Sequence, residues 1–146
     1  MFVTEILYRT LQEQESNLPL FTYLVNAIKI LDLADKGYAN FHLIFLIGFC
    51  RHLGFSPQNN YCLKNQYFDI ENALFINKQP LHQHFIPPPA SRYLSTVMEC
   101  SFENMDKLRL NSTLRNTLVT GILDYYRFHV AGMGQFKSFS VLKEIF

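Results

Sequence analysis

The sequence feature that most limits the fold is an uninterrupted apolar run, Leu43-Ile44-Phe45-Leu46-Ile47. The run lies in a segment over 41–53 that contains no proline and that has Arg51 and His52 just before Gly54. Positive charge suits the C-terminal end of a helix, and glycine commonly terminates one. Because the run would be apolar on every side of such a helix, we expect this helix to be buried at the centre of a bundle.

The flanking segments also show helical periodicity, with apolar residues recurring at every third or fourth position. The longest late helix is predicted to begin at a cap, Asn111 or Ser112, and to run to about residue 130. A final helix is predicted after Ser138 or Ser140. The other predicted helices cover 3–15, 19–35, 90–100 and, irregularly, 104–108. The sequence therefore predicts an all-α fold, a helical bundle of about six helices, formed by 1–146 as a single domain.

Residues 56–90 are expected to form an irregular insertion within this domain. Asparagine and proline are frequent there, and helical periodicity disappears. Two short segments, 67–69 and 73–75, are predicted to pair as a β-hairpin that turns at Glu71-Asn72. Because the insertion is rich in aromatic residues, we expect it to pack on the helices.

Composition excludes several classes of protein. With 49% hydrophobic residues in a chain of 146, there is enough apolar surface for a core, which argues against disorder. The 13 basic and 12 acidic residues argue against nucleic acid as the main partner, although residues 101–146 carry a small positive excess. No apolar stretch approaches the roughly 20 residues that span a membrane. We therefore expect a cytoplasmic protein.

Metal binding and catalysis have weak support in the sequence. His82 and His84, with Cys62 or Cys100, are candidate metal ligands. The alternative is a proline-bounded surface loop with incidental histidines, which is favoured because no carboxylate lies nearby in sequence to orient them. The three cysteines form no CxxC pair, and no nucleophile elbow, P-loop or HExxH helix occurs. We expect no enzyme, no metal site and no cofactor.

Three stretches resemble the C-terminal domain of the RecO recombination mediators. In chain order they are Glu5–Arg9 with Leu20-Phe21, then Phe41-His42-Leu43 running into Arg51–Pro57, and finally Leu123–His129 with Lys137–Phe146. Each stretch alone consists of common helix residues, but together they occur in the right order and cover the chain. The barrel of the oligonucleotide-binding type that normally begins these proteins is absent from this sequence. The four-cysteine zinc site of many family members is also missing, since only Cys62 has a counterpart and Asn65 stands at the next position.

The resemblance implies a non-catalytic mediator of bacterial homologous recombination and DNA repair, associated with the nucleoid. The implied partners are single-stranded DNA, the RecR mediator, and the acidic C-terminal tail of single-stranded DNA-binding protein. That tail ends in a phenylalanine with a free carboxylate, so its capture requires an apolar pocket rimmed by cations.

A helical wheel suggests where such a pocket could lie. Arg115 and His129 fall within about 40° of each other, beside the apolar side that carries Ile122 and Tyr125. The candidate site residues are Arg51, His52, Arg115, Ile122, Tyr125, Arg127, His129 and Lys137. The alternative is that each arginine solvates a helix face or fixes a helix end.

Two other functions remain open from the sequence. A factor that binds or anneals single-stranded DNA directly would use Lys107, Arg109 and Lys143 against phosphates, although ordinary solvated charges also explain these residues. A metal-binding regulatory helical domain would use the histidines of the insertion.

Overall fold

The computed structural model describes residues 18–33 and 38–130. These ranges contain four α-helices, two 3-10 helices and three short strands. The helices are α2 (Leu18–Leu33), η1 (Tyr38–Asn40), α3 (Phe41–Leu53), α4 (Ala90–Glu99), η2 (Phe102–Lys107) and α5 (Ser112–His129). The predicted helices over 3–15 and after Ser138 lie outside the described residues. The described residues are mostly helical, and the small antiparallel sheet comes from the middle of the sequence. This confirms the predicted fold class.

Helix α3 is the centre of the core, as its apolar run predicted. It begins at Phe41 and ends at Leu53, and nine of its 13 residues are buried. Gly54 adopts a left-handed conformation with φ of 90°, and its N–H group points back to the Arg51 carbonyl oxygen at 3.4 Å. Helices α2, α4 and α5 all contact α3. The central position follows because the helix offers no polar side to solvent.

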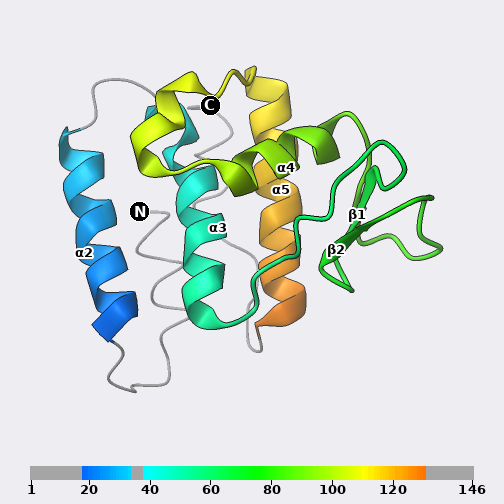
Figure 1. The fold of residues 1–146 in the computed structure, drawn as a ribbon, viewed down its shortest axis with the longest axis horizontal. Coiled ribbons are helices and arrows are strands. Elements are labelled where there is room, and N and C mark those ends of the chain that lie inside the picture. The colour runs from blue at the N-terminus through cyan, green and yellow to red at the C-terminus, as the bar shows by residue number, and fades with distance from the viewer. Residues whose placement is uncertain (1–17, 34–37, 131–146) are drawn as a thin grey trace.

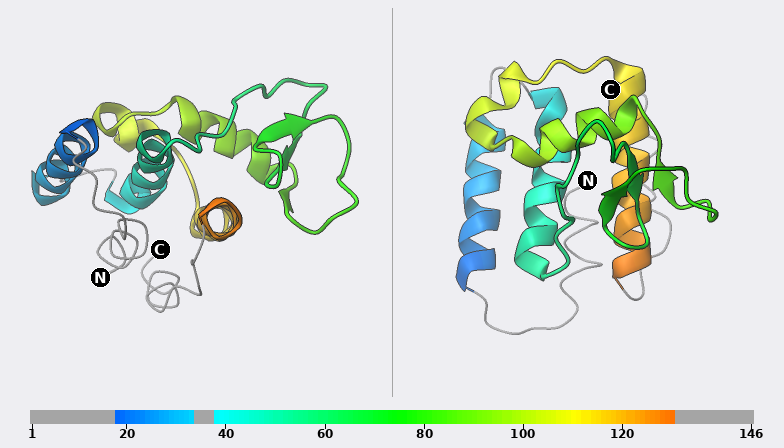
Figure 2. Two further views of the ribbon diagram at one scale, coloured as in Figure 1. Left: turned by 90° about the horizontal axis from the view of Figure 1, so that it is seen from below. Right: turned by 45° about the vertical axis from the view of Figure 1, so that its right-hand side comes forward.

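Helices α2, α3 and α5 form a row, and α4 and η2 pack on one face of it (Figures 1 and 2). Figure 1 shows α2, α3 and α5 running side by side, with α2 at one edge, and α4 crossing over α3 and α5. In the view from below in Figure 2, α4 and η2 lie on the same side of the row, and the sheet lies beyond α5. The described helices therefore bury α3 between two neighbours and a crossing layer.

Helix α5 is fixed to the core by its cap and by a buried tyrosine. The Asn111 side chain accepts a hydrogen bond from the Leu114 N–H group at 2.8 Å, which satisfies one of the free donors at the helix start. One of the two caps predicted from the sequence is thus the observed one. Near the other end, the buried Tyr126 hydroxyl donates a hydrogen bond to the Leu46 carbonyl oxygen of α3.

The insertion contains the predicted hairpin and one further strand. Strands β1 (Tyr67–Asp69) and β2 (Leu74–Ile76) pair antiparallel, and β3 (Phe85–Ile86) pairs with the other edge of β1. The third strand was not predicted, because two residues before a run of prolines carry no periodicity. Ile86 packs so closely on α5 that a Cβ atom at Gly121 would lie 2.4 Å from it. The insertion therefore packs on the helices, as its aromatic content indicated.

Candidate functional site

The two apolar residues proposed for partner binding lie inside the core. Ile122 and Tyr125 of α5 are both buried. The Tyr125 hydroxyl donates a hydrogen bond to the Phe55 carbonyl oxygen, and the Tyr125 ring lies 4.3 Å from the His129 ring. These side chains hold the loop after α3 against α5, and neither Ile122 nor Tyr125 lines any of the three grooves described below.

Arg115 lies in a polar junction between segments that are distant in sequence. Its Nε atom donates to Asn40 Oδ1 at 3.2 Å, and an Nη2 hydrogen bond reaches the Leu110 carbonyl oxygen at 2.7 Å. The buried Asn40 amide in turn donates to the carbonyl oxygens of Met105 and Leu108, at 3.2 and 2.8 Å. The arrangement ties the start of α5 to η1 and to the residues around η2.

Arg127 and His129 are also engaged by neighbouring groups. The Arg127 guanidinium pairs with the Asp124 carboxylate one turn earlier on α5. His129 places Nε2 at 2.7 Å from the Ile70 carbonyl oxygen and so donates a hydrogen bond across to the hairpin turn. Although Arg115 and His129 share a side of the wheel, 14 residues of helix separate them by about 21 Å along the axis. The structure does not bring them together.

Of the remaining candidates, one is an arginine that is hydrogen-bonded to a neighbouring helix and one is an exposed histidine. Arg51 donates a hydrogen bond from its guanidinium to the Met98 carbonyl oxygen of α4. His52 is exposed at the end of α3, with its ring 4.6 Å from the Tyr23 ring of α2. Lys137 lies outside the described residues.

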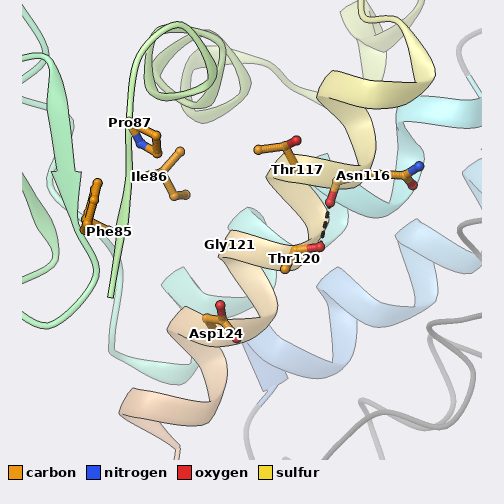
Figure 3. Close-up of a pocket in the computed structure, with 8 residues that line it drawn as sticks. All are labelled: Phe85, Ile86, Pro87, Asn116, Thr117, Thr120, Gly121 and Asp124. Atoms are coloured by element: carbon orange, nitrogen blue, oxygen red, sulfur yellow. Dashed lines mark hydrogen bonds between the residues drawn. The ribbon is translucent and has the colours of Figure 1, made fainter. Parts of the chain in front are cut away.

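A groove between β3 and α5, shown in Figure 3, has the wrong chemistry for an acidic ligand. It has a volume of about 320 Å³, and its lining residues are Phe85, Ile86, Pro87, Asn116, Thr117, Thr120, Gly121 and Asp124. The Thr117 and Thr120 hydroxyls donate to carbonyl oxygens one turn earlier on the helix. The one charged residue of this lining is Asp124, whose carboxylate is paired with Arg127, so the lining offers an acidic ligand no cation of its own.

A second groove, which we name the basic groove, lies between α4 and η2. Its volume is about 380 Å³, and it is lined by Arg92, Tyr93, Thr96, Cys100, Asn104, Lys107, Leu108 and Arg109. Three of these residues are cations with exposed side chains. Within residues 18–33 and 38–130, the side chains of these three cations form no hydrogen bond or ion pair. Burial, with a smaller contribution from the Glu99 charge, raises the pKa of the Cys100 thiol, so the cysteine adds no negative charge.

The basic groove was only partly visible in the sequence. Lys107 and Arg109 were candidates for phosphate contacts, but Arg92 lies 15 positions before Lys107 and on another helix. A pattern within one helix cannot show that two elements lie side by side. Here a turn at Cys100, whose N–H group bonds the Val97 carbonyl oxygen at 3.1 Å, returns the chain beside α4.

A third groove, which we name the α2 groove, contains His52. Its volume is about 510 Å³, and it is lined by Leu18, Pro19, Phe21, Thr22, Tyr23, Val25, Asn26, Lys29 and His52. The lining is mixed along α2, where apolar and aromatic side chains alternate with the neutral polar Thr22 and Asn26. It carries two basic residues, Lys29 and His52, and no carboxylate. Of the eight residues proposed for the partner-binding pocket, His52 lines one of these three grooves, and the six others that the structure describes line none of them.

One histidine of the insertion, His82, lies beside carboxylates that sequence spacing did not reveal. His82 Nε2 is 2.9 Å from Asp69 Oδ1 and 3.7 Å from Glu71 Oε2. Burial acts to raise the pKa of the Asp69 carboxyl. The hydrogen bonds from Asn72, the His82 charge and the Glu71 N–H group together outweigh burial, so the pKa is lowered. No group of three or more His, Cys, Asp or Glu side chains that could hold a metal ion occurs among the residues the structure describes.

No helix in the described ranges is long and apolar enough to cross a membrane.

Comparison with known proteins agrees on one family. The family described as "Recombination protein O C terminal" matches residues 1–138. The chain is 34% identical over 146 residues to the DNA repair protein RecO of Azobacteroides pseudotrichonymphae. It is 38% identical to the protein of that name from Phocaeicola vulgatus over 146 residues, and 38% identical to that of Bacteroides fragilis over 147.

These matches cover 100% of this chain but 61% of each relative, so the chain spans about three fifths of their length. No solved structure matches the chain. The three stretches that resembled the RecO C-terminal domain thus agree with a match over nearly the whole sequence. The chain belongs to the RecO C-terminal family.

Proposed function

We propose that this chain is a non-catalytic partner-binding domain of DNA repair and homologous recombination. Membership of the RecO family and relatives named as DNA repair proteins support this role. In this proposal the domain binds single-stranded DNA-binding protein and helps a recombinase to load on the coated strand. A RecR-like protein is a further proposed partner, and the proposed location is the cytoplasm, at the nucleoid.

We also propose that the domain catalyses no reaction. A catalytic cysteine must ionise readily, and it must be accessible. Burial raises the pKa of the Cys50 thiol to about 12, and the thiol donates a hydrogen bond to the Ile47 carbonyl oxygen. Cys50 is therefore unsuited to act as a catalytic nucleophile, which agrees better with a binding domain than with an enzyme that uses this thiol.

The basic groove is the observation that carries the proposed tail capture. An acidic peptide needs cations that are not already neutralised, and Arg92, Lys107 and Arg109 all line this groove. Glu103 and Asp106 also belong to η2 but do not line it. The half-buried Tyr93 ring supplies apolar surface for the terminal phenylalanine of the tail. The proposed site thus moves from the α5 arginines to the groove between α4 and η2.

A peptide titration tests this assignment. The ligand is a short acidic peptide that ends in phenylalanine with a free carboxylate, and binding is followed by isothermal calorimetry on the full chain. We expect the double variant Lys107→Ala/Arg109→Ala to bind at least about tenfold more weakly, a loss of roughly 1.4 kcal/mol. Lys78→Ala is the matched control, because Lys78 is an exposed cation of the insertion.

Two results would contradict the proposal. Equal affinity of the double variant and the parent chain would remove the basic groove as the binding site. Equal affinity for the same peptide with an amidated C-terminus would show that the terminal carboxylate is not recognised.

Direct binding of single-stranded DNA is a second candidate, since the same groove could hold phosphates with Tyr93 as a stacking surface. Three phosphate contacts would make the logarithm of the association constant fall with the logarithm of salt concentration at a slope of about −2. The balanced charge of the chain favours a short acidic peptide over a long polyanion. Oligonucleotide anisotropy at several salt concentrations separates the two, because flat curves at low salt exclude DNA binding.

A further inference from the structure

We propose that the α2 groove is a second docking site, which takes an amphipathic helix with acidic flanks from a partner protein. It shares no lining residue with the basic groove. The inference goes beyond the proposed tail capture, because it concerns a different surface and a different kind of ligand.

An exposed apolar stripe runs along α2. Leu18, Phe21 and Ile28 are 71%, 63% and 52% exposed, and Val25 lies between the last two. Their spacing of three, four and three residues puts them on one side of the helix. The stripe is about 15 Å long, which suits a partner helix of about three turns. Large apolar side chains gathered on one side in this way commonly mark an interaction surface.

The stripe is not needed to attach α2 to the rest of the protein. The opposite side of the helix does this, through buried Leu20 and Ala27 and through Tyr23, whose hydroxyl donates to the Phe45 carbonyl oxygen at 2.9 Å. Figures 1 and 2 show α2 as the outermost of the described helices, with α3 on its inner side. The exposed stripe therefore takes no part in the buried contact with α3. Its residues Leu18, Phe21 and Val25 line the α2 groove, and Ile28 lies outside that lining.

Charge at the groove indicates the character of the partner. Lys29 and His52 line it, and the lining contains no acidic residue. Asp32, the acidic residue of α2, lies outside the lining. A helix that places apolar residues on the stripe and carboxylates at its margins would match both features, which is the usual way an amphipathic helix binds in a groove.

A second copy of this chain fits the groove less well. Its own α2 would bring the same basic residues to the contact, so Lys29 and His52 would meet their counterparts. An acidic helix does not meet this objection, because its carboxylates would face Lys29 and His52.

The experiment maps peptide contacts on the full chain by ¹⁵N chemical shifts. The probe is a synthetic helical peptide with leucines at the spacing of the stripe and glutamates on both flanks. The control probe has lysines in place of the glutamates. We expect shifts at Phe21, Val25, Lys29 and His52 with the acidic probe, and none with the basic probe.

Variants separate the apolar and the ionic contributions. Phe21→Ser should weaken the acidic probe at least tenfold, and Leu81→Ser is the matched control, since Leu81 is an exposed apolar residue of the insertion. Lys29→Glu leaves the stripe intact. It should weaken the acidic probe and permit binding of the basic one, and circular dichroism checks that each variant keeps its helices.

Three outcomes would overturn the proposal. One is the absence of shifts at millimolar acidic probe. Another is a set of shifts confined to Arg92, Lys107 and Arg109, which would place all acidic ligands in the basic groove. The third is a dimer seen by sedimentation that Phe21→Ser abolishes, because a second copy would then occupy the stripe. Failure of tail capture in the basic groove would leave the shifts on α2 unaffected.

Discussion

Tyr23 of α2 lies directly over Gly48 of α3, where an added Cβ atom would be 2.2 Å from the tyrosine hydroxyl oxygen. The same hydroxyl bonds the Phe45 carbonyl oxygen, so the ring cannot move aside without losing this hydrogen bond. Gly48 thus permits the close contact between these two helices.

Gly48→Ala is therefore expected to destabilise the fold, even though alanine favours a helix by about 1 kcal/mol over glycine. Overpacking against Tyr23 and loss of its hydrogen bond should outweigh that gain, leaving a net loss of about 1–2 kcal/mol. This loss of unfolding free energy can be measured by urea denaturation. In a Tyr23→Phe background, which lacks the nearest oxygen, the same change should cost less. An equal cost in both backgrounds would contradict the contact.

His42 should make stability depend on pH in a defined window. Burial lowers its pKa to about 4, whereas an unfolded histidine titrates near 6.5. Between these values the unfolded chain binds more protons than the folded one, so stability is complete above about pH 6.5 and falls as the pH drops towards 4. The expected loss is up to about 3 kcal/mol.

The variant His42→Gln should flatten this part of the pH profile, as measured by urea unfolding at several pH values. His52→Gln is the control, because His52 is exposed on the same helix. If the His42 variant kept the full slope between pH 6.5 and 4, the buried neutral histidine would not be its source.

Arg115 is expected to stabilise the fold and not to bind the acidic peptide. Arg115→Gln removes the charge from the junction with Asn40 and should lower the unfolding free energy by about 1–3 kcal/mol. Peptide affinity should stay within about twofold of the parent chain. Asn40→Ala should destabilise similarly, and the double variant should lose less than the sum, because the two side chains share one network. A peptide-binding defect in a stable Arg115→Gln chain would return this residue to the binding site.

His129 should couple the hairpin turn to the end of α5. His129→Ala removes the hydrogen bond to the Ile70 carbonyl oxygen and is expected to cost about 1 kcal/mol. Amide hydrogens of β1 and β2 should then exchange about fivefold faster, as followed by hydrogen exchange. His84→Ala provides the comparison, since His84 is exposed and its ring contacts those of His82 and Phe128. Unchanged exchange in the His129 variant would show that the hairpin is held elsewhere.

The sequence predicted the elements whose signals are local. The end of helix α3 could be predicted because Arg51 and His52 precede Gly54, and the start of α5 because an asparagine precedes its periodic pattern. The hairpin of β1 and β2 could be predicted because its two strands and the turn between them are adjacent in the sequence. Strand β3 depends on pairing with β1, and its two residues contain no pattern of their own.

The candidate site was harder to predict, because it depends on contacts between distant segments. The wheel correctly put Arg115 beside an apolar side of α5, but it could not show Asn40, 75 positions away, as its partner. The same applies to Arg92, which joins Lys107 and Arg109 only through the packing of α4 beside η2. Apolar residues on a wheel indicate burial, as Ile122 and Tyr125 show, and do not by themselves make a groove.

The burial of most of α3 has a consequence for how such a domain can evolve. A helix that is surrounded by α2, α4 and α5 cannot change one side without disturbing another neighbour, so substitutions along its buried length are constrained together. The exposed sides of α2 and α4 carry no such constraint. Binding preferences on those outer helices can therefore diverge between relatives while the central helix keeps the same scaffold.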